Sequence, residues 1–440
     1  MDLEFLGGAG QVGRSALLVN DRLLVDFGME NATPTRYPIR TPEPDAAVVS
    51  HAHLDHAGAV PALLSGDRRP PIHWTPQTAE LARLLARDTL RLQGNSPSLP
   101  FHEQERKRLT EVSRTHGYRE PFEAAGHRVE FFDAGHVPGS AHVLVDDGDV
   151  RLLYTGDFNT ENQRLVAGST ARPDADVVVT ESTYGDHTRP PRADLEAAFV
   201  ESVRETLWEG GTVVAPAFAI GRTQEVTSIL AAADVDCYVD GMGTRVTRLL
   251  QRHPEFLRDA AVLDRAKANA RFVPDGAVGP GGTTGVRQGQ RERIAEESTV
   301  VVTTAGMLSG GPAMTYVPAI RDHPTNKITL TGYQVEGTPG RELLETGRAE
   351  FDGRVLPVSA QVEYYDFSAH ADREGLLSFL DAYRDAEILV VHGDDTGGFA
   401  TDLREVGFDA AAPELGETVS VETGSRRPRG GDGKRRDDGQ

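Results

Sequence analysis

The sequence contains very little cysteine and very little lysine. Cys237 is the single cysteine among 440 residues, which excludes an intramolecular disulfide and a zinc site built from several cysteines. A reducing cytoplasm is therefore the expected location. Only four of the 46 basic residues are lysines, namely Lys107, Lys267, Lys327 and Lys434.

The chain also lacks a long apolar run and a basic N-terminal region. No segment approaches the roughly 18 uninterrupted apolar residues of a membrane-spanning helix. The first residues, Met1 to Glu4, begin a strand pattern and do not resemble a secretory leader. We therefore expect a soluble protein with no membrane partner.

Positive charge is scarce relative to negative charge. The 67 Asp and Glu residues exceed the 46 Lys and Arg residues, so the formal net charge is -21 at pH 7. An acidic, arginine-rich and lysine-poor composition is typical of adaptation to a salt-rich cytoplasm. A genome rich in G and C would explain the loss of lysine but not the acid excess. At molar salt the Debye length is only ~3 Å, so binding of nucleic acid would depend on short-range contacts.

The densest group of ligand-type side chains lies directly after the apolar run 46–49, which predicts a buried strand. Its members are His51, His53, Asp55 and His56. The two histidines at 51 and 53 can point to the same side of an extended segment, whereas the next pair lies on the turn into a helix. The spacing predicts two half-sites, and imidazoles with carboxylates suit two zinc-type cations that share a bridging group.

A Gly-x-Gly-x-x-Gly pattern at residues 8–13 is the main competing motif. A dinucleotide site needs a helix directly after the glycines, so that its N-terminal amides meet the pyrophosphate. Residues 16–19 and 23–25 are instead typical of two strands around a tight turn. We therefore expect no dinucleotide cofactor, and we expect the glycines to form a loop near the metals.

The His-x-His-x-Asp-His pattern resembles the metallo-β-lactamase superfamily, so further ligands are sought in chain order. Three candidates each follow an apolar run that predicts a strand, and they are Asp26, His136 and Asp157. The resemblance implies one zinc bound by His51, His53, His136 and Asp157. It implies a second zinc, two per chain, bound by Asp55, His56, Asp157 and His392. Asp157 would bridge the two ions, and Asp26 would orient a ligand.

After Pro190-Pro191 the pattern changes to an alternation of helices and strands, which predicts a parallel sheet with crossover helices. The predicted elements are helices 192–209, 222–232 and 243–252 and strands 212–216, 236–239 and 299–304. A glycine-rich stretch, 276–289, is predicted to be a mobile connection. Beyond these elements, a helix at 373–384 and a strand at 387–391 end at His392.

This organisation resembles the β-CASP branch, the nucleic-acid hydrolases that insert a second domain into the metallo-β-lactamase fold. Its motifs A, B and C match Glu181 in Thr-Glu-Ser-Thr-Tyr-Gly, His370 in Ser-Ala-His-Ala-Asp, and His392. The implied fold is α/β, an αββα sandwich with an inserted α/β domain. We expect the sandwich at 1–188 and 351–423, the insertion at 189–350, and a disordered basic tail at 424–440.

The resemblance also implies the chemistry. A histidine in motif C is typical of RNA-cleaving members, whereas the DNA-repair members typically carry valine there. The implied activity is hydrolysis of single-stranded RNA to 5′-phosphate and 3′-hydroxyl ends, in RNA processing or decay, as in relatives of the nuclease subunit of the cleavage and polyadenylation specificity factor. The implied catalytic residues are Asp55 and His370, the latter as a general acid held by Glu181.

Two residue groups are candidates for contact with RNA phosphate. They are Ser368, beside motif B, and the loop residues Gly306, Ser309 and Gly310, whose amides could form an anion-binding nest. The loop could equally be an ordinary strand-to-helix turn. A homodimer is implied by the resemblance alone.

Other functions stay open. A small-ester metallohydrolase shares the ligand motif but would not need the insertion or the pair His370 and Glu181. A non-catalytic subunit of an RNA-processing complex could lose metal ligands, yet every expected ligand is present here. The sequence does not separate an endonuclease from a 5′ to 3′ exonuclease.

Overall fold

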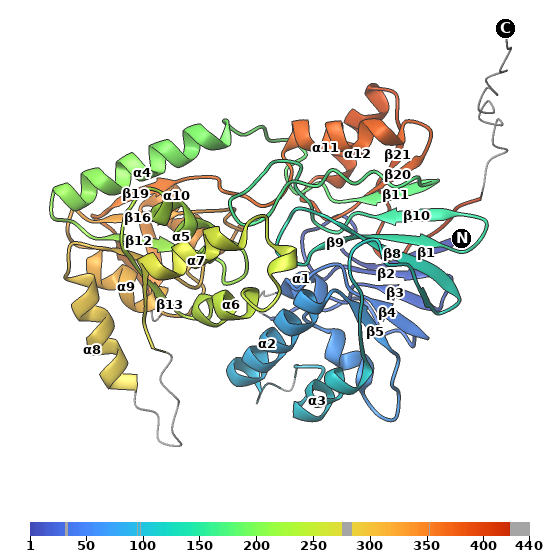
Figure 1. The fold of residues 1–440 in the computed structure, drawn as a ribbon, viewed down its shortest axis with the longest axis horizontal. Helices are drawn as coiled ribbons and strands as arrows, with labels where there is room; N and C mark the ends of the chain where they lie inside the picture. The colour runs from blue at the N-terminus through green and yellow to red at the C-terminus, as the bar shows by residue number, and fades with distance from the viewer. Residues whose placement is uncertain (31–33, 95, 97, 275–283, 352, 423–440) are drawn as a thin grey trace, which may run out of the picture.

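Two β-sheets pack face to face in one half of the molecule, and a parallel sheet flanked by helices forms the other half (Figure 1). The computed structural model describes all residues except 31–33, 95, 97, 275–283, 352 and 423–440. The predicted basic tail, 424–440, therefore lies outside the described residues. No helix of the described part is long and apolar enough to cross a membrane.

The first half contains two seven-stranded sheets whose edges come from both ends of the chain. In spatial order the first sheet is β22 (Thr418–Ser420), β1 (Asp2–Gly7), β2 (Ala16–Val19), β3 (Leu23–Val25), β4 (Ala46–Val48), β5 (Ile72–Trp74) and β6 (Ser113–Thr115). The second sheet is β21 (Asp409–Ala411), β20 (Glu387–Val390), β11 (Val177–Thr180), β10 (Arg151–Tyr154), β9 (Ala141–Asp146), β8 (His127–Asp133) and β7 (Phe122–Ala124).

The two sheets bury one apolar layer between them, and helices cover both outer faces. Phe5, Val129 and Leu152 lie in the inner layer, and β2 and β11 are buried at every position because both of their faces are covered. The first sheet is covered by α1 (Leu54–Ala57), η1 (Val60–Leu64), α2 (Pro76–Gln93) and α3 (Glu103–Val112). The second is covered by α11 (Arg373–Leu380), η3 (Asp381–Tyr383) and α12 (Thr396–Glu405). This is the predicted αββα order.

The second half is built on a six-stranded sheet in which all paired neighbours are parallel. Its spatial order is β14 (Ala270–Phe272), β13 (Cys237–Asp240), β15 (Val300–Thr303), β12 (Val213–Pro216), β16 (Lys327–Leu330) and β19 (Gln361–Tyr364). Its helices are α4 (Arg192–Trp208), α5 (Arg222–Ala232), α6 (Gly243–Leu250), η2 (Pro254–Phe256), α7 (Ala260–Asn269), α8 (Thr284–Ala295), α9 (Ala313–Ile320) and α10 (Pro339–Thr346). A hairpin of β17 (Arg348–Phe351) and β18 (Arg354–Pro357) completes it. The predicted inserted α/β architecture is thus confirmed.

The structure corrects two local predictions. The segment after His56 does not form one continuous helix, because the single turn α1 ends at Ala57 and a 3-10 turn begins at Val60, next to Pro61. Of the glycine-rich stretch 276–289, residues 276–283 lie outside the described residues, and residues 284–289 form the start of helix α8 (Thr284–Ala295). The pattern after the glycines at 8–13 is a strand, β2, as the sequence predicted.

Candidate metal centre

The candidate site lies where the ends of several strands meet. His51 and His53 follow β4, Asp26 follows β3, and Asp157 follows β10. Strands β10, β11 and β20 run parallel to one another, so their carboxyl ends lie at the same end of the second sheet. Asp157, Glu181 and His392 follow these strand ends. The fold thereby brings together side chains that are as much as 366 residues apart in the sequence, Asp26 and His392.

One group of ligand-type atoms surrounds Oδ2 of Asp157. The group consists of His51, His53, His136 and Asp157, whose ligand-type atoms all lie within 4.8 Å of one another. Nε2 of His51 lies 3.5 Å from Oδ2 of Asp157, and Nε2 of His136 lies 3.8 Å from it. Nε2 of His136 and Nδ1 of His53 are 3.0 Å apart. Three imidazoles and one carboxylate thus converge on a single point.

A second group uses the other oxygen of the same carboxylate. Asp55, His56, Asp157 and His392 again lie with their ligand-type atoms within 4.8 Å of one another. Nε2 of His56 lies 3.2 Å from Oδ1 of Asp157, and Nε2 of His392 lies 3.2 Å from Oδ2 of Asp55. The geometry therefore places Asp157 between two groups, each of which could hold one cation.

The chemistry of these atoms fits a metal. Nε2 of His51 and Oδ1 of Asp157 are buried, and neither has a hydrogen-bond partner among the described residues. A buried polar atom without a partner costs about 1–3 kcal/mol, so both atoms are poised for a cation. Ring nitrogens also face each other, as Nε2 of His56 and Nε2 of His392 do at 3.4 Å. Neutral imidazole nitrogens and carboxylate oxygens are zinc ligands.

Outer hydrogen bonds set the orientation of two of the imidazoles. Nδ1 of His56 donates to Oδ2 of Asp26 at 2.7 Å, and Nδ1 of His136 donates to the carbonyl oxygen of Ala369 at 2.9 Å. Each bond leaves Nε2 free to face the cluster. Asp26 and His392 both have left-handed backbones, with φ of 59° and 47°. Non-glycine residues in this region often mark functional sites, because the surrounding structure must enforce the strained conformation.

Four groups in this network were missed by the sequence reasoning. Ser50 and Tyr154 both bond the carboxylate of Asp26, Ala369 accepts from His136, and Thr183 contacts Glu181. Tyr154 carried a usable signal, because a tyrosine inside an apolar strand needs a partner for its hydroxyl group. Ala369 carried none, since only its main-chain carbonyl is used.

Glu181 and His370 form a close pair beside the cluster. Nδ1 of His370 lies 3.0 Å and 2.8 Å from the two carboxylate oxygens of Glu181. Phe158 donates its main-chain N–H to Glu181 at 2.7 Å, and the hydroxyl of Thr183 donates to the same carboxylate at 2.5 Å. Nε2 of His370 lies 4.0 Å from Oδ2 of Asp157. The pair is thus fixed with the far nitrogen of His370 directed at the candidate metal centre.

The electrostatics divide the histidines into two kinds. Burial and the neighbouring imidazoles hold the pKa of His51 and His136 well below the usual value, so both rings are neutral near pH 7. Burial also lowers the pKa of His392, but the carboxylates of Asp157 and Asp55 outweigh it and raise that pKa to about 9. Burial raises the pKa of Asp157, yet the imidazoles of His392 and His56 keep it well below the ordinary range. Without a metal, protons on part of the cluster balance its carboxylates.

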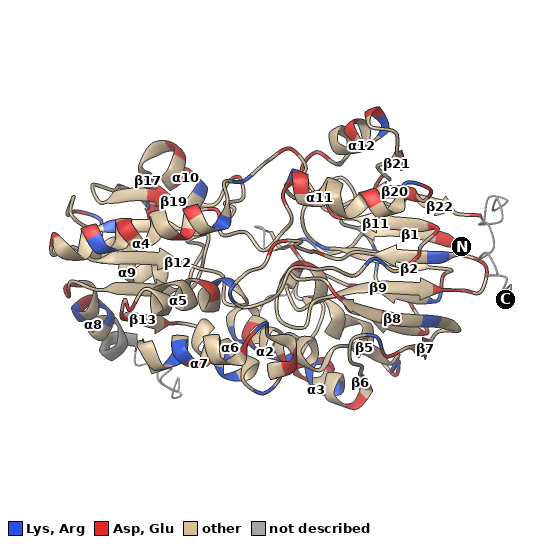
Figure 2. Cartoon of the chain, turned by 45° about the horizontal axis from the view of Figure 1, so that its top comes forward, with Lys and Arg blue, Asp and Glu red and all other residues tan. Residues whose placement is uncertain are grey.

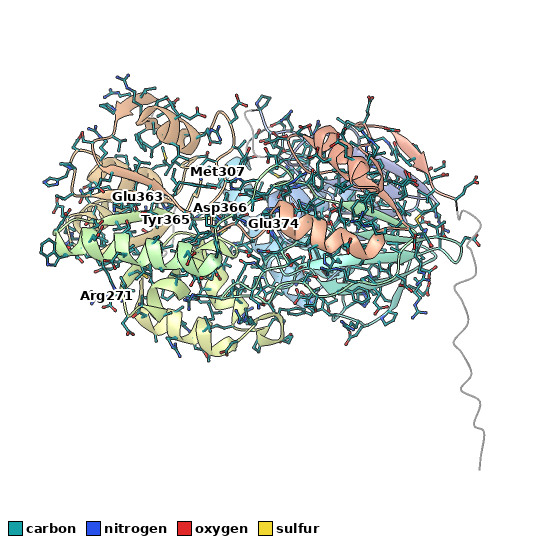
Figure 3. All side chains as sticks on the ribbon, turned by 90° about the horizontal axis from the view of Figure 1, so that it is seen from above. Arg271, Met307, Glu363, Tyr365, Asp366 and Glu374 are labelled. Carbon is teal, nitrogen blue, oxygen red and sulfur yellow. The ribbon has the colours of Figure 1, made fainter. Side chains whose placement is uncertain are left out.

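The candidate phosphate-binding residues lie at the carboxyl edge of the parallel sheet and beside motif B. Ser368 is buried, and its hydroxyl accepts the main-chain N–H of His370 at 3.2 Å. Ser309 is exposed on the loop after β15, and φ of Gly310 is 130°. In Figure 3 the neighbouring residues Met307 and Asp366 are labelled between the parallel sheet and α11. The guanidinium of Arg189 contacts the carbonyls of Ser368 and His370, which the sequence did not indicate.

Family models match three parts of the chain. They are the metallo-beta-lactamase superfamily at 9–203, the Beta-Casp domain at 223–343, and the Zn-dependent metallo-hydrolase RNA specificity domain at 355–413. A crystal structure of a protein of unknown function from Enterococcus faecalis V583 has a similar fold, with a TM-score of 0.59 at 13% identity over 96% of this chain and 99% of that one.

Curated proteins of archaea are similar over almost the whole chain. "Probable RNase MJ4" of Methanocaldococcus jannaschii is 32% identical over 96% of this chain and 100% of its own length. "RNase aCSPSF2" of Saccharolobus solfataricus is 34% identical over 95% of this chain and 85% of its own length. "Transcription termination factor FttA" of Pyrococcus abyssi is 31% identical over 94% of this chain and 70% of its own length. With these matches, the chain belongs to the metallo-beta-lactamase superfamily, as a member that carries a Beta-Casp domain and an RNA specificity domain.

Proposed function

We propose that this chain is a two-zinc ribonuclease that hydrolyses single-stranded RNA to 5′-phosphate and 3′-hydroxyl ends. The observation that carries the proposal is the position of Asp157, whose two oxygens face two separate groups of ligand-type atoms. The RNase names of the relatives and the RNA specificity domain support RNA as the substrate. Relatives named as transcription termination factors fit a role in RNA processing or termination.

Each half of the cluster would hold one ion. His51, His53, His136 and Asp157 would bind the first, and Asp55, His56, Asp157 and His392 the second. When bound, two such cations neutralise the charge of a phosphodiester and lower the pKa of a water molecule between them. Asp26 would hold His56 in the tautomer that exposes Nε2 to its ion. Asp55, whose side chain is 28% exposed, would also contact the attacking water.

His370 would supply the proton that the leaving 3′ oxygen needs. Burial lowers the pKa of His370, but the carboxylates of Glu181 and Asp157 raise it above the ordinary value, which favours a protonated ring. Glu181 accepts from Nδ1, so the acidic proton sits on Nε2 at the face of the cluster. The side chain of His370 is 18% exposed whereas that of Glu181 is 1% exposed, which leaves the histidine within reach of a substrate. These features fit a general acid and the residue that orients it.

Further predictions belong to this proposal. Ser368, Gly306, Ser309 and Gly310 would bind RNA phosphates, with the loop amides as donors. The boundaries 1–188, 189–350 and 351–423 remain predictions, although β19 joins the sheet of the inserted half from beyond residue 350. A cytoplasmic location, a homodimer and a salt-adapted source also remain predictions.

Two measurements on the same purified protein test the proposal. Mass spectrometry of metal content should find about two zinc ions per chain. A 5′-labelled single-stranded RNA, incubated in molar KCl and read on a sequencing gel, should be cleaved to products with 3′-hydroxyl ends. Labelled fragments of intermediate length would identify an endonuclease, and an immediate labelled mononucleotide would identify a 5′ to 3′ exonuclease.

The same two measurements, together with a thioester hydrolysis assay, separate the alternatives. Two metals with no RNA cleavage but rapid hydrolysis of a thioester would indicate a small-ester hydrolase. No bound metal and no cleavage would indicate a non-catalytic subunit. Either result would contradict the proposed ribonuclease.

A further inference from the structure

A short loop at residues 163–165 lies directly behind the proposed ligand His136. Nε2 of Gln163 donates to the carbonyl oxygen of Gly135 at 2.9 Å and to that of His136 at 3.0 Å. The side chain of Gln163 is buried. Gly135 also fits closely against the chain on either side of this loop, since an added Cβ would lie 2.5 Å from the carbonyl oxygen of Asn159 and 2.6 Å from the main-chain nitrogen of Ser169. The loop therefore sets the position of the main chain that carries His136.

The other side of this loop is held by a carboxylate of the inserted half. Oε1 of Glu225 accepts the main-chain N–H of Arg164, and Oε2 accepts that of Leu165, both at 2.9 Å. Glu225 lies on α5 and is only 1% exposed. The guanidinium of Arg192, at the start of α4, contacts the same carboxylate and balances its charge. A buried carboxylate that spans two consecutive main-chain amides fixes both the position and the direction of the loop.

Arg258, also in the inserted half, bonds the same loop. The main-chain N–H of Arg258 donates to the carbonyl of Leu165 at 2.9 Å, and its guanidinium donates to the carbonyl of Gln163 at 2.8 Å. Gly221, which precedes α5, approaches Val137 so closely that its Cβ would lie 2.8 Å from Cγ1 of that residue. The inserted half thus contacts the His136 segment directly and through the loop.

We propose that Glu225 is a positioning residue of the metal centre: through residues 163–165 it holds His136 at the distance that metal binding requires. The proposal rests on the metal centre proposed above and assigns the inserted half a part in building it. Glu225 is not one of the proposed ligands, and its carboxylate bonds the loop and Arg192. It acts through Gln163, whose amide group links the loop to the carbonyl of His136.

The physical basis is the geometry of the carboxylate. Two acceptor oxygens match two adjacent donors, whereas an amide at position 225 would direct its own NH2 group at one of the main-chain N–H groups. The loop would shift to relieve that contact, and the carbonyl of His136 would follow. Partners that orient a ligand without touching the metal typically contribute 10–100-fold to metal affinity. Glu225→Gln should therefore weaken metal binding without removing any ligand.

The test measures Co²⁺ affinity by competition with a chelator, followed by absorption, in the full chain. Glu225→Gln is compared with Glu196→Gln, a matched control. Glu196 accepts from the side chains of Arg164 and Arg192, at 2.8 Å and 3.0 Å, but bonds no main-chain atom of the loop. Gln163→Met removes the same path from the other side and keeps the side-chain volume. The thermal midpoint of each metal-free variant shows that it is folded.

Glu225→Gln and Gln163→Met should each bind Co²⁺ about 10-fold more weakly than wild type. The double variant should also be about 10-fold weaker, because both changes interrupt one path. Glu196→Gln should bind as wild type does. Wild-type affinity in folded Glu225→Gln, or a double variant weakened about 100-fold, would overturn the assignment. A wild-type protein that binds no Co²⁺ would overturn the metal centre itself.

Discussion

At the scale of single residues, Thr183 connects the two chemical units of the site. Its hydroxyl donates to Glu181 at 2.5 Å and lies 3.1 Å from Nδ1 of His392, which can donate to it. The proposed acid pair and the second ligand group are therefore joined by one hydroxyl. Because Nδ1 of His392 is occupied in this way, its Nε2 faces Asp55 and His56. One residue thus helps to orient both a proton donor and a ligand.

His370→Ala should slow RNA cleavage by about 10²-fold or more, because the leaving oxygen loses its proton donor. Both metals should remain, since His370 belongs to neither of the two four-residue groups, although with Asp157 and Glu181 it forms a third, three-residue group in which its Nδ1 already bonds Glu181. Single-turnover cleavage and metal content, measured on the same sample, check this. The control is His323→Ala, which removes an exposed histidine that bonds Thr325. Cleavage at the wild-type rate in the His370 variant would exclude it as the acid.

Metal binding should release protons at neutral pH. In the metal-free protein the pKa of His392 is about 9, so this ring is protonated at pH 7.5 and must lose its proton to become a ligand. The apparent affinity should rise as the pH rises toward 9 and then level off. Calorimetry in two buffers of different ionisation enthalpy measures the number of protons released. Equal heats in both buffers at pH 7.5 would show that His392 is already neutral.

The sequence predicted the side chains of this site better than its scaffolding. His51, His53, Asp55 and His56 stand together in one motif, and their ligand chemistry can be recognised from residue type and spacing. The support from Ala369 could not be predicted, because it uses a main-chain carbonyl that any residue would provide. The sequence indicates that the hydroxyl group of Tyr154 needs a partner, but it does not identify Asp26 as that partner, because the pairing depends on how the two sheets pack.

At the scale of elements, α5 is a helix through which the inserted half contacts the segment that carries His136. Its residues Arg222–Ala232 match the predicted range 222–232, because an apolar helical pattern follows a glycine. The preceding Gly221 has φ of 82° and leaves no room for a side chain beside Val137. The beginning of α5 is therefore constrained both by its backbone and by the His136 segment.

Gly221→Ala should destabilise the protein by about 1–3 kcal/mol, because alanine is strained at positive φ and its methyl group would overlap Val137. The urea midpoint at fixed KCl measures the effect. The matched control is Gly397→Ala in α12, where an added Cβ meets no atom within 4 Å. That change should be neutral or stabilise by about 0.4–1 kcal/mol. A Gly221 variant as stable as the control would mean that the segment moves without cost.

Elements were predicted well where local pattern determines them and poorly where distant pairing does. Strand β15 follows from a clear apolar run, and helix α4 follows from a segment rich in helix-forming Ala, Leu, Glu and Arg after two prolines. The position of β19 could not be predicted, because a four-residue strand with no buried residue carries no sign that it pairs with β16. The start of α8 was missed because its sequence, Thr-Gly-Val-Arg-Gln-Gly, contains two glycines, which disfavour helix.

At the scale of the whole molecule, the acid excess is distributed and not local. Figure 2 shows Asp and Glu on helices and loops of both halves, mixed with Lys and Arg. Many of the acids are paired, as in the exposed bridges of Arg22 with Asp45 and of Arg384 with Asp381. Pairing cannot balance the total, because 67 acids face 46 bases. The excess negative charges repel one another, and this repulsion is strongest in the folded state, where the charges are closest together.

Salt should therefore stabilise this protein. Raising KCl from 0.1 M to 1 M shortens the Debye length from about 10 Å to about 3 Å and screens the repulsion. The same salt weakens exposed ion pairs, but each contributes only about 0–1 kcal/mol. A net charge of -21 makes repulsion the larger effect. The thermal midpoint should rise by at least ~5 °C.

The shape of the salt curve distinguishes the two explanations of the composition. Screening saturates, so most of the rise should occur by about 0.5 M KCl, whereas exclusion of salt from the surface adds a further slow increase. Thermal unfolding at a series of KCl concentrations, followed by circular dichroism, measures both phases. A large early rise is expected if the acids are an adaptation to salt. A flat or falling midpoint would leave arginine-rich codon usage as the explanation of the missing lysines and would give the acid excess no role in stability.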